Sequence, residues 1–467
     1  MVSLSLVGLP NDVTIGHTAR VSAHAAERTS LRQALGLAEF RAVLFSSALS
    51  TLGDQVTRIA VAVLVYERTN SPFFATATLA CSYLTWLLAG PFLSAIADRC
   101  RWRRLMVGCD LARAALITLL LIPDVPLWLV FAVLLLVGML APPFDAAKSA
   151  LLPEILTGEQ YLAGNAVVGA VNQGAMVGGF LLGGLLVATL SPQGALAVDA
   201  ATFVVSALLL GFGLRPRPRP EPSGNSLARD ARDGISVVAG SPRLRLMLGY
   251  GLLGSITMIA PEGLAVPVAD QLGGGAATAG LLTAALPAGF LLGSFAVLRV
   301  APDRREKLLP VLTGLACVPL LLSAFAPSTT VLAGLWALSG ACSASQLVAN
   351  AAYMLSAPEG VRARAFGVAV SLIMATQGVT LLAVGALAER FDPRLAVAIA
   401  GIVALLLLVP IASAGRSPAE RARPDATPAA PSWSAAAPRP RTESQPEAAL
   451  ETPRAQAAPV NRRRSLG

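Results

Sequence analysis

Twelve apolar stretches, each long enough to cross a lipid bilayer, recur between residues 42 and 411. About 17 to 25 apolar residues in a helix span the roughly 30 Å of hydrocarbon in a membrane. The backbone must satisfy its own hydrogen bonds there, because no water is available, and a helix does so within one segment. Hydrophobic residues make up 55% of the chain and charged residues 13%, whereas soluble domains carry about 25% charged residues. We therefore predict an all-α membrane protein with twelve transmembrane helices in two six-helix bundles. The predicted helices occupy residues 42–65, 75–96, 105–122, 127–141, 162–190, 195–214, 246–268, 280–298, 308–326, 331–353, 365–387 and 395–411.

The basic residues predict that both termini face the cytoplasm. Cytoplasmic loops retain Lys and Arg, while short translocated loops lose them. Eighteen such residues fall in the loops on one side, against Arg68, Arg390 and Arg394 on the other. The net charge of +9 follows largely from this asymmetry, so no nucleic-acid partner is implied. Almost all the basic residues are arginine, which indicates a GC-rich bacterial genome. We expect a multi-pass protein of the bacterial inner (plasma) membrane.

The hydrophobic pattern divides the chain into five parts. These are a cytoplasmic N-terminal segment (1–39), a first bundle (40–214), a basic, Pro-rich cytoplasmic linker (215–245), a second bundle (246–413) and a disordered cytoplasmic tail (414–467). Similar residue pairs recur at an offset of about 200 residues, which is typical of a duplicated six-helix unit. One example is Gln173 and Gly174 in the fifth helix against Gln377 and Gly378 in the eleventh.

Several kinds of chemistry are excluded by the residues that are missing. The only histidines, His17 and His24, precede the first apolar stretch, so no histidine is available inside the bundles for catalysis or for zinc. Neither Lys148 nor Lys307 follows a glycine, so the chain has no GxxxxGK[ST] phosphate loop. We expect no enzyme activity, no cofactor and no metal. Any uphill transport must draw on an ion gradient or on a separate subunit, and any proton carriage falls to carboxylates.

Charged side chains inside the apolar stretches are the main candidates for a functional site. Asp54 and Arg58 lie one turn apart in the first helix, and Glu262 lies in the seventh, its counterpart in the repeat. A charge at a helix centre costs about 2.5 to 3.5 kcal/mol on insertion scales, so each is expected to face a cavity and to be paired. We expect Asp54 to pair with Arg58, and Arg58 also to meet Glu262 across the cavity. Further polar candidates for lining that cavity are Gln173, Gln346, Asn350 and Gln377.

Two interpretations of these charges remain open. Asp54 and Arg58 form a permanent structural ion pair, or Asp54 or Glu262 exchanges protons when Arg58 turns to another partner. Asp199, in the sixth helix, is interpreted instead as a hydrogen-bonding residue in helix packing.

The loop between the second and third helices, "SAIADRCRWRR", carries the clearest motif. It resembles the loop 2-3 motif of the major facilitator superfamily, through Asp98, Arg99, Arg103 and Arg104. The departures from that motif are Ser94, Arg101 and Trp102. The resemblance covers most of the chain and implies twelve helices, cytoplasmic termini and transport by alternating access.

The resemblance also implies a gating role for the motif. Asp98 would meet the start of the eleventh helix, near Arg362 and Arg364, and hold the cytoplasmic side closed. Alternatively, the loop arginines are only positive-inside anchors. Asp110 and Arg113, three residues apart in the third helix, are expected to pair with each other or with the loop arginines, in a structural or a gating role.

The fifth helix contains small residues that permit close helix packing in lipid. Gly179, Gly183 and Gly184 resemble part of a motif of proton antiporters in this superfamily, with Phe180 in place of its proline. We expect these glycines to pack the fifth helix against the eighth. The stretches "KSALLPEI" and "EGVRARAFG" most resemble the bacterial efflux branch that includes the enterobactin exporter.

These features together predict a secondary active transporter that works as a monomer in the bilayer. Its expected activity is proton-coupled export of a small amphipathic molecule, such as a drug-like compound, a siderophore or a secondary metabolite. The alternatives are an uptake or facilitative carrier and, in a different class, a transport-inactive membrane sensor or scaffold.

Overall fold

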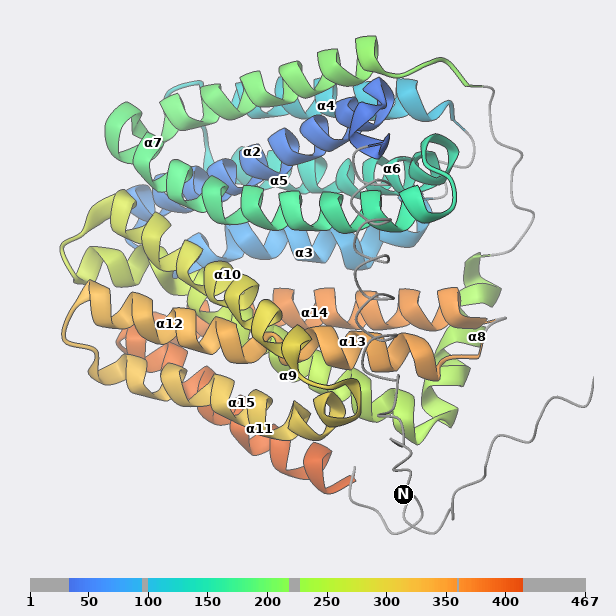
Figure 1. The fold of residues 1–467 in the computed structure, drawn as a ribbon. Coiled ribbons are helices and arrows are strands. Elements are labelled where there is room, and N and C mark those ends of the chain that lie inside the picture. The colour runs from blue at the N-terminus through green and yellow to red at the C-terminus, as the bar shows by residue number, and fades with distance from the viewer. Residues whose placement is uncertain (1–32, 95–99, 218–226, 359–360, 415–467) are drawn as a thin grey trace, which may run out of the picture. The chain divides into compact units, whose positions relative to one another are not determined.

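The computed structural model describes residues 33–94, 100–217, 227–358 and 361–414, and every regular element within these ranges is a helix (Figure 1). Nine segments of this described part are long and apolar enough to cross a membrane. The predicted tail lies almost wholly outside the described residues, as does most of the segment 1–39.

The first bundle is formed by the helices coloured blue to green in Figure 1. They are α2 (Ala38–Thr69), α3 (Pro72–Ser94), α4 (Trp102–Leu119), α5 (Leu127–Met139), α6 (Ala141–Ile155) and α7 (Glu159–Gly213). The helix α7 reverses direction at Ser191, whose φ of 78° and ψ of 165° lie outside the helical range. Pro192 follows directly and cannot donate the hydrogen bond that would continue the helix. The two limbs of α7 therefore correspond to the fifth and sixth predicted helices.

The second bundle is formed by the helices coloured yellow-green to red in Figure 1. They are α8 (Leu227–Gly240), α9 (Pro242–Gln271), α10 (Gly275–Arg299), α11 (Pro302–Leu322), the short 3₁₀ turn η1 (Ser323–Phe325), α12 (Thr329–Ser343), α13 (Ser345–Ser356), α14 (Arg362–Ala388) and α15 (Pro393–Ala414). The helices α9 to α15 cover all six stretches predicted for this half.

The fourth predicted helix of each half is interrupted in the structure. In the first bundle α5 gives way to α6 at Leu140, and in the second α12 gives way to α13 at Ala344. These breaks lie about 200 residues apart, as expected for corresponding positions in a duplicated unit. Pro142 and Pro143 lie in the first turn of α6, where the missing N–H groups cost nothing to the new helix.

Two predicted loops contain helices. Lys148 was expected in the loop after the fourth helix, but it lies within α6, where it pairs with Asp145. The linker predicted at 215–245 contains α8, an amphipathic helix that packs on the start of α14. A β-carbon at Gly234 would lie 2.7 Å from the backbone oxygen of Arg364, so the two helices approach too closely for a larger residue.

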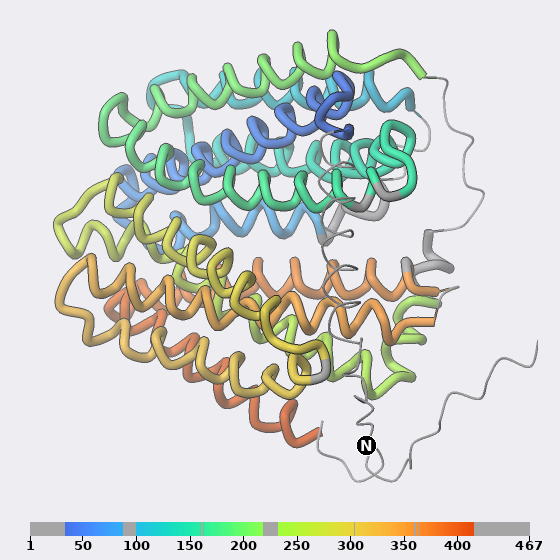
Figure 2. The backbone as a smooth tube through the Cα atoms, in the orientation of Figure 1, coloured from blue at the N-terminus to red at the C-terminus, as the bar shows by residue number. Residues whose placement is uncertain are grey.

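The glycines of the first limb of α7 face two different neighbours. A β-carbon at Gly184 would lie 2.7 Å from the oxygen of Ala276, on the neighbouring α10, which corresponds to the eighth predicted helix. Gly179 and Gly183 instead approach the backbone of α2, so the prediction that all three glycines pack on the eighth helix was wrong for these two. Figure 2 shows the blue α2 running beside the limbs of α7, its most extensive packing partner.

Candidate transport cavity

A cavity of about 330 Å³ lies in the first bundle, against α14 of the second. Asp54 and Arg58 of α2, Arg113 of α4 and Asp145 of α6 give it two carboxyl groups and two guanidinium groups. Its remaining lining is mainly apolar and aromatic, and includes Val61, Leu79, Tyr83, Trp86, Leu134 and Met374. A cavity of mixed apolar surface with a few convergent polar groups is the usual form of a small-molecule site.

Arg58 joins the two bundles. Its Nη1 lies 2.9 Å from Oε1 of Glu262 on α9, and the two side chains are only 14% and 11% exposed. Nη2 donates to the hydroxyl of Tyr83 on α3 at 2.5 Å, and Nη1 to the side-chain oxygen of Gln55 at 3.3 Å. Within the described chain Glu262 Oε1 accepts no well-aligned hydrogen bond, so its contact with Arg58 is an ion pair without hydrogen-bond geometry.

Asp54 is not paired with Arg58, and that prediction was wrong. In the part of the chain that the structure describes, neither a hydrogen bond nor an ion pair reaches the Asp54 carboxylate. The i, i+4 spacing allows such a pair, but the Arg58 guanidinium is engaged by three other side chains, from α2, α3 and α9.

Asp110 and Arg113 are both buried but do not form the expected ion pair. Asp110 Oδ2 accepts a hydrogen bond from Ser206 at 2.5 Å, and Ser206 lies 2.7 Å from Ser46. Arg113 donates to Ser50 at 3.4 Å. Its guanidinium carbon also lies 5.4 and 5.5 Å from the ring centres of Phe144 and Phe203. Among the described residues, Asp110 Oδ1 and Arg113 Nε have no hydrogen-bond partner.

Further charged residues near the cavity were not among the site candidates. Lys148 Nζ lies 2.7 Å from Asp145 Oδ1. The sequence could have indicated this pair, because Asp145 and Lys148 lie three residues apart in a stretch that is otherwise uncharged. Asp199 accepts hydrogen bonds from Thr57 and Thr202, so it joins α7 to α2 in the packing role expected for it.

The four polar cavity candidates separate into two groups. Gln346 and Asn350 line a second cavity, of about 240 Å³, between helices of the second bundle. Met374 on α14 borders both cavities, so they adjoin at this residue. Gln173 and Gln377 line neither of them.

The predicted gating residues are only partly described. Asp98 and Arg99 lie outside the described residues, so the contact expected between Asp98 and the start of α14 lies outside them too. Arg103 donates to the backbone oxygen of Gly211 at the end of α7, while Arg104 is exposed.

At the start of α14, Arg362 donates to the oxygen of Ala357 at 3.4 Å. Arg364 pairs with Asp233 of α8 at 3.0 Å. The side chain of Arg364 therefore ties α14 to the linker helix.

A set of polar contacts joins the bundles near the turn between α2 and α3. The Tyr66 hydroxyl donates to Asp270 at 3.3 Å. Glu389, at the end of α14, accepts hydrogen bonds from the hydroxyl of Ser71 and from the backbone N–H of Phe73, the latter at 3.0 Å. We call these contacts, together with the Arg58–Glu262 pair, the α2–α3 end latch.

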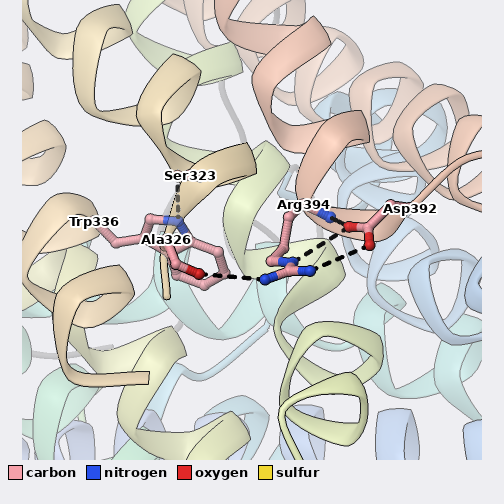
Figure 3. A network of polar contacts seen from close by, with 5 residues as sticks. All are labelled: Ser323, Ala326, Trp336, Asp392 and Arg394. Carbon is pink, nitrogen blue, oxygen red and sulfur yellow. Dashed lines mark hydrogen bonds and ion pairs between the residues drawn. The ribbon is translucent and has the colours of Figure 1, made fainter. Parts of the chain in front are cut away.

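The turn between α14 and α15 is stabilised separately (Figure 3). Asp392 accepts hydrogen bonds from the backbone and the side chain of Arg394, whose Nη1 reaches the oxygen of Ala326 at 3.3 Å. Burial alone would raise the pKa of Asp392, but these hydrogen bonds hold it below its ordinary value. Trp336 donates to Ser323 at 3.1 Å on the adjoining η1 turn.

Two helical bundles with ionisable side chains around an internal cavity define a membrane transporter of the two-bundle type. The family profile described as Major Facilitator Superfamily matches residues 43–300 and 246–455. The chain therefore belongs to the Major Facilitator Superfamily.

Two curated relatives from Bacillus subtilis (strain 168) carry no assigned substrate. The uncharacterized MFS-type transporter YjbB is 27% identical over 31% of this chain and 37% of its own length. The uncharacterized MFS-type transporter YkuC is 24% identical over 46% of this chain and 54% of its own. The matched regions thus cover less than two thirds of either relative.

Solved transporters share the fold. A point mutant of the nucleoside transporter NupG superposes with a TM-score of 0.67 at 11% identity, over 80% of this chain and 99% of its own. An inward-facing, unoccupied bacterial homologue of the human lysosomal transporter Spinster gives 0.59 at 15% identity, over 80% and 96%. At these identities the comparison establishes the fold alone.

Proposed function

We propose that this protein exports a small amphipathic molecule across the bacterial inner membrane in exchange for protons, with both termini in the cytoplasm. The observation that carries the proposal is Asp54, a carboxylate that lines the cavity of about 330 Å³ and has no ion-pair partner in the described chain. An ionisable residue inside a membrane marks a functional site by default, and Asp and Glu carry protons in transporters. The alternative of a permanent ion pair between Asp54 and Arg58 leaves this unpaired carboxylate unexplained.

The charges around Asp54 support a cycle in two steps. Arg113 lines the same cavity as Asp54 and carries the opposite charge, so a proton or a cationic group of the substrate competes with Arg113 for this carboxylate. Binding of one partner excludes the other, because a single carboxylate carries a single negative charge. That exclusion is the physical basis of antiport.

The α2–α3 end latch supports an assignment of conformation. In the orientation given by the basic loops, this latch lies on the outer side. Arg58 and Glu262 come from different bundles, so opening the outer side must separate their 2.9 Å contact. We infer that the structure is closed outside and that Glu262 becomes available to protons or to substrate when the latch opens.

The lining of the cavity supports an amphipathic substrate. Apolar and aromatic residues such as Leu79, Trp86 and Met374 supply area for hydrophobic contact, and Asp54 and Arg113 supply the polar anchors. The resemblance of the loop motifs to the efflux branch that includes the enterobactin exporter favours export over uptake. A sensor or scaffold would move no substrate, so a measured flux of substrate distinguishes it from the proposed transporter.

The test begins with a deletion strain, whose drug susceptibility and metabolite export identify a transported compound. Flux of that compound is then measured in vesicles with an imposed pH gradient. Asp54→Asn should abolish coupled flux with expression unchanged, while Asp124→Asn, on the loop between α4 and α5, should not alter it. If the deletion strain and wild type have the same drug susceptibility and export the same metabolites, the proposed export role is contradicted.

A further inference from the structure

A third cavity, separate from the two described above, lies at the end of the first bundle where α4 begins and α7 ends. It has a volume of about 440 Å³ and is lined by residues of both helices and of the segment that follows α7. Five arginines line it: Arg101, Arg103, Arg104, Arg215 and Arg217. The positive-inside distribution places this end of the bundle at the cytoplasmic surface of the membrane.

Only part of this positive charge is neutralised. Arg217 forms two hydrogen bonds of 3.0 Å with Glu39, and Arg103 donates to the oxygen of Gly211. Within the described chain, no acceptor reaches the side chains of Arg101, Arg104 or Arg215, which are all exposed. Glu39 accepts a hydrogen bond from the backbone N–H of Arg215 and so offsets part of the charge there. The three guanidinium groups around this hollow nevertheless keep their hydrogen-bond donors available to an anion.

The surface beside this cavity is apolar and exposed. Val204, Leu208 and Phe212 lie four residues apart on the second limb of α7, with exposed fractions of 40%, 50% and 89%. Leu111 on α4 is also apolar and 48% exposed. The helix α4 packs beside α7 (Figure 1). In a membrane-spanning bundle such a stripe faces the acyl chains of lipid. Phe212 also lines the hollow that adjoins the arginine cavity, so the stripe leads up to it.

We propose that this arginine cavity binds the headgroup of an anionic phospholipid, with its acyl chains along the stripe on α4 and α7. Guanidinium groups hold phosphate oxygens in a bidentate geometry, and basic pockets between transmembrane helices on the cytoplasmic side select acidic headgroups. Trp102, which also lines the cavity, belongs to the residues that prefer the lipid–water interface. A free anion could use the arginines but would gain nothing from the stripe.

The experiment is a titration of the purified full-length protein with phosphatidylglycerol, with bound lipids counted by native mass spectrometry. R101Q/R215Q should weaken the tightest binding about 30-fold, and R101Q alone about fivefold, as expected for one or two lost arginine contacts. R101K/R215K keeps the charge and should bind within a few-fold of wild type. It also shows that the side chains can be changed without loss of the fold.

The matched control is R299Q/R304Q, which removes two exposed arginines of the second bundle, one at the end of α10 and one in the first turn of α11. It should leave the tightest binding within about threefold of wild type, since the cavity is intact. An equal loss in this control would overturn the proposal, because binding would then depend on overall charge. Inorganic phosphate should not displace the lipid at large excess, and displacement would show that the site takes a free anion instead.

Discussion

The ion pair between Arg58 and Glu262 gives the sharpest prediction, because it links the two bundles through a single contact of 2.9 Å. Glu262→Gln keeps the size of the side chain but removes its charge. The two partners are 14% and 11% exposed, so solvent screens their attraction only weakly. Breaking a buried pair by removing one partner costs about 3 to 5 kcal/mol when the other charge is left with nothing.

Arg58 keeps two partners in this variant, because Tyr83 and Gln55 remain within hydrogen-bond distance. The loss should therefore be smaller than that range, about 1.5 to 3 kcal/mol for the attraction between the two charges. This free energy is lost from the closed state alone, because opening separates the pair. The ratio of closed to open molecules should fall by about 10- to 150-fold.

The assay is a distance measurement between spin labels on opposite bundles. Pro123→Cys and Pro327→Cys lie in exposed loops at the ends of α4 and α11, on the outer side in the proposed orientation. Glu262→Gln should convert a mainly short distance distribution into one with a large long-distance component. Glu306→Gln, which breaks the exposed pair with Arg243 inside the second bundle, is the matched control and should cause no change. Identical distributions for Glu262→Gln and wild type would refute the role of the Arg58–Glu262 pair in holding the outer side closed.

Three further predictions concern packing, the α14–α15 turn and the tail. Gly184→Ala should destabilise the protein or disable transport, because its β-carbon would lie 2.7 Å from a backbone oxygen of α10. Gly178→Ala is the control, since its β-carbon would meet nothing within 4 Å. Equal melting temperatures and transport rates for the two variants would contradict this packing. Asp392 has a depressed pKa, so its stabilising contribution is present at neutral pH and is lost as pH falls below about 4. The melting temperatures of wild type and Asp392→Asn should therefore converge in acid. A difference that grows as the pH falls would contradict the stabilising role of the ionised Asp392. Truncation after Ala414 should preserve transport, as expected for a polar, Pro-rich tail, and an inactive but folded truncated protein would contradict this.

The membrane makes much of the fold predictable. Lipid imposes a length on each span and forbids unsatisfied backbone groups, so the apolar stretches coincide with the helices. The gap between the fifth and sixth stretches falls at Ser191, where α7 reverses. The helix α8 was not predicted, because it is amphipathic and short and directly follows the Pro-rich part of the linker sequence.

The pairing of the charges was less predictable than their presence. A buried Arg58 needs a partner, and the sequence placed Glu262 in the seventh helix as a carboxylate that could reach it. Which of two possible carboxylates it meets depends on how the helices rotate, and spacing along α2 does not determine that. Gly183 and Gly184 illustrate the same limit, since adjacent residues point about 100° apart on a helix and meet different neighbours.

The central claim is that Asp54 exchanges protons during transport. The most direct measurement is flux of the identified compound in proteoliposomes, with and without an imposed pH gradient. The proposal predicts that Asp54→Asn loses accumulation driven by the gradient but still exchanges labelled for unlabelled compound across the membrane. Gradient-driven accumulation by Asp54→Asn at the rate of the wild type would contradict it.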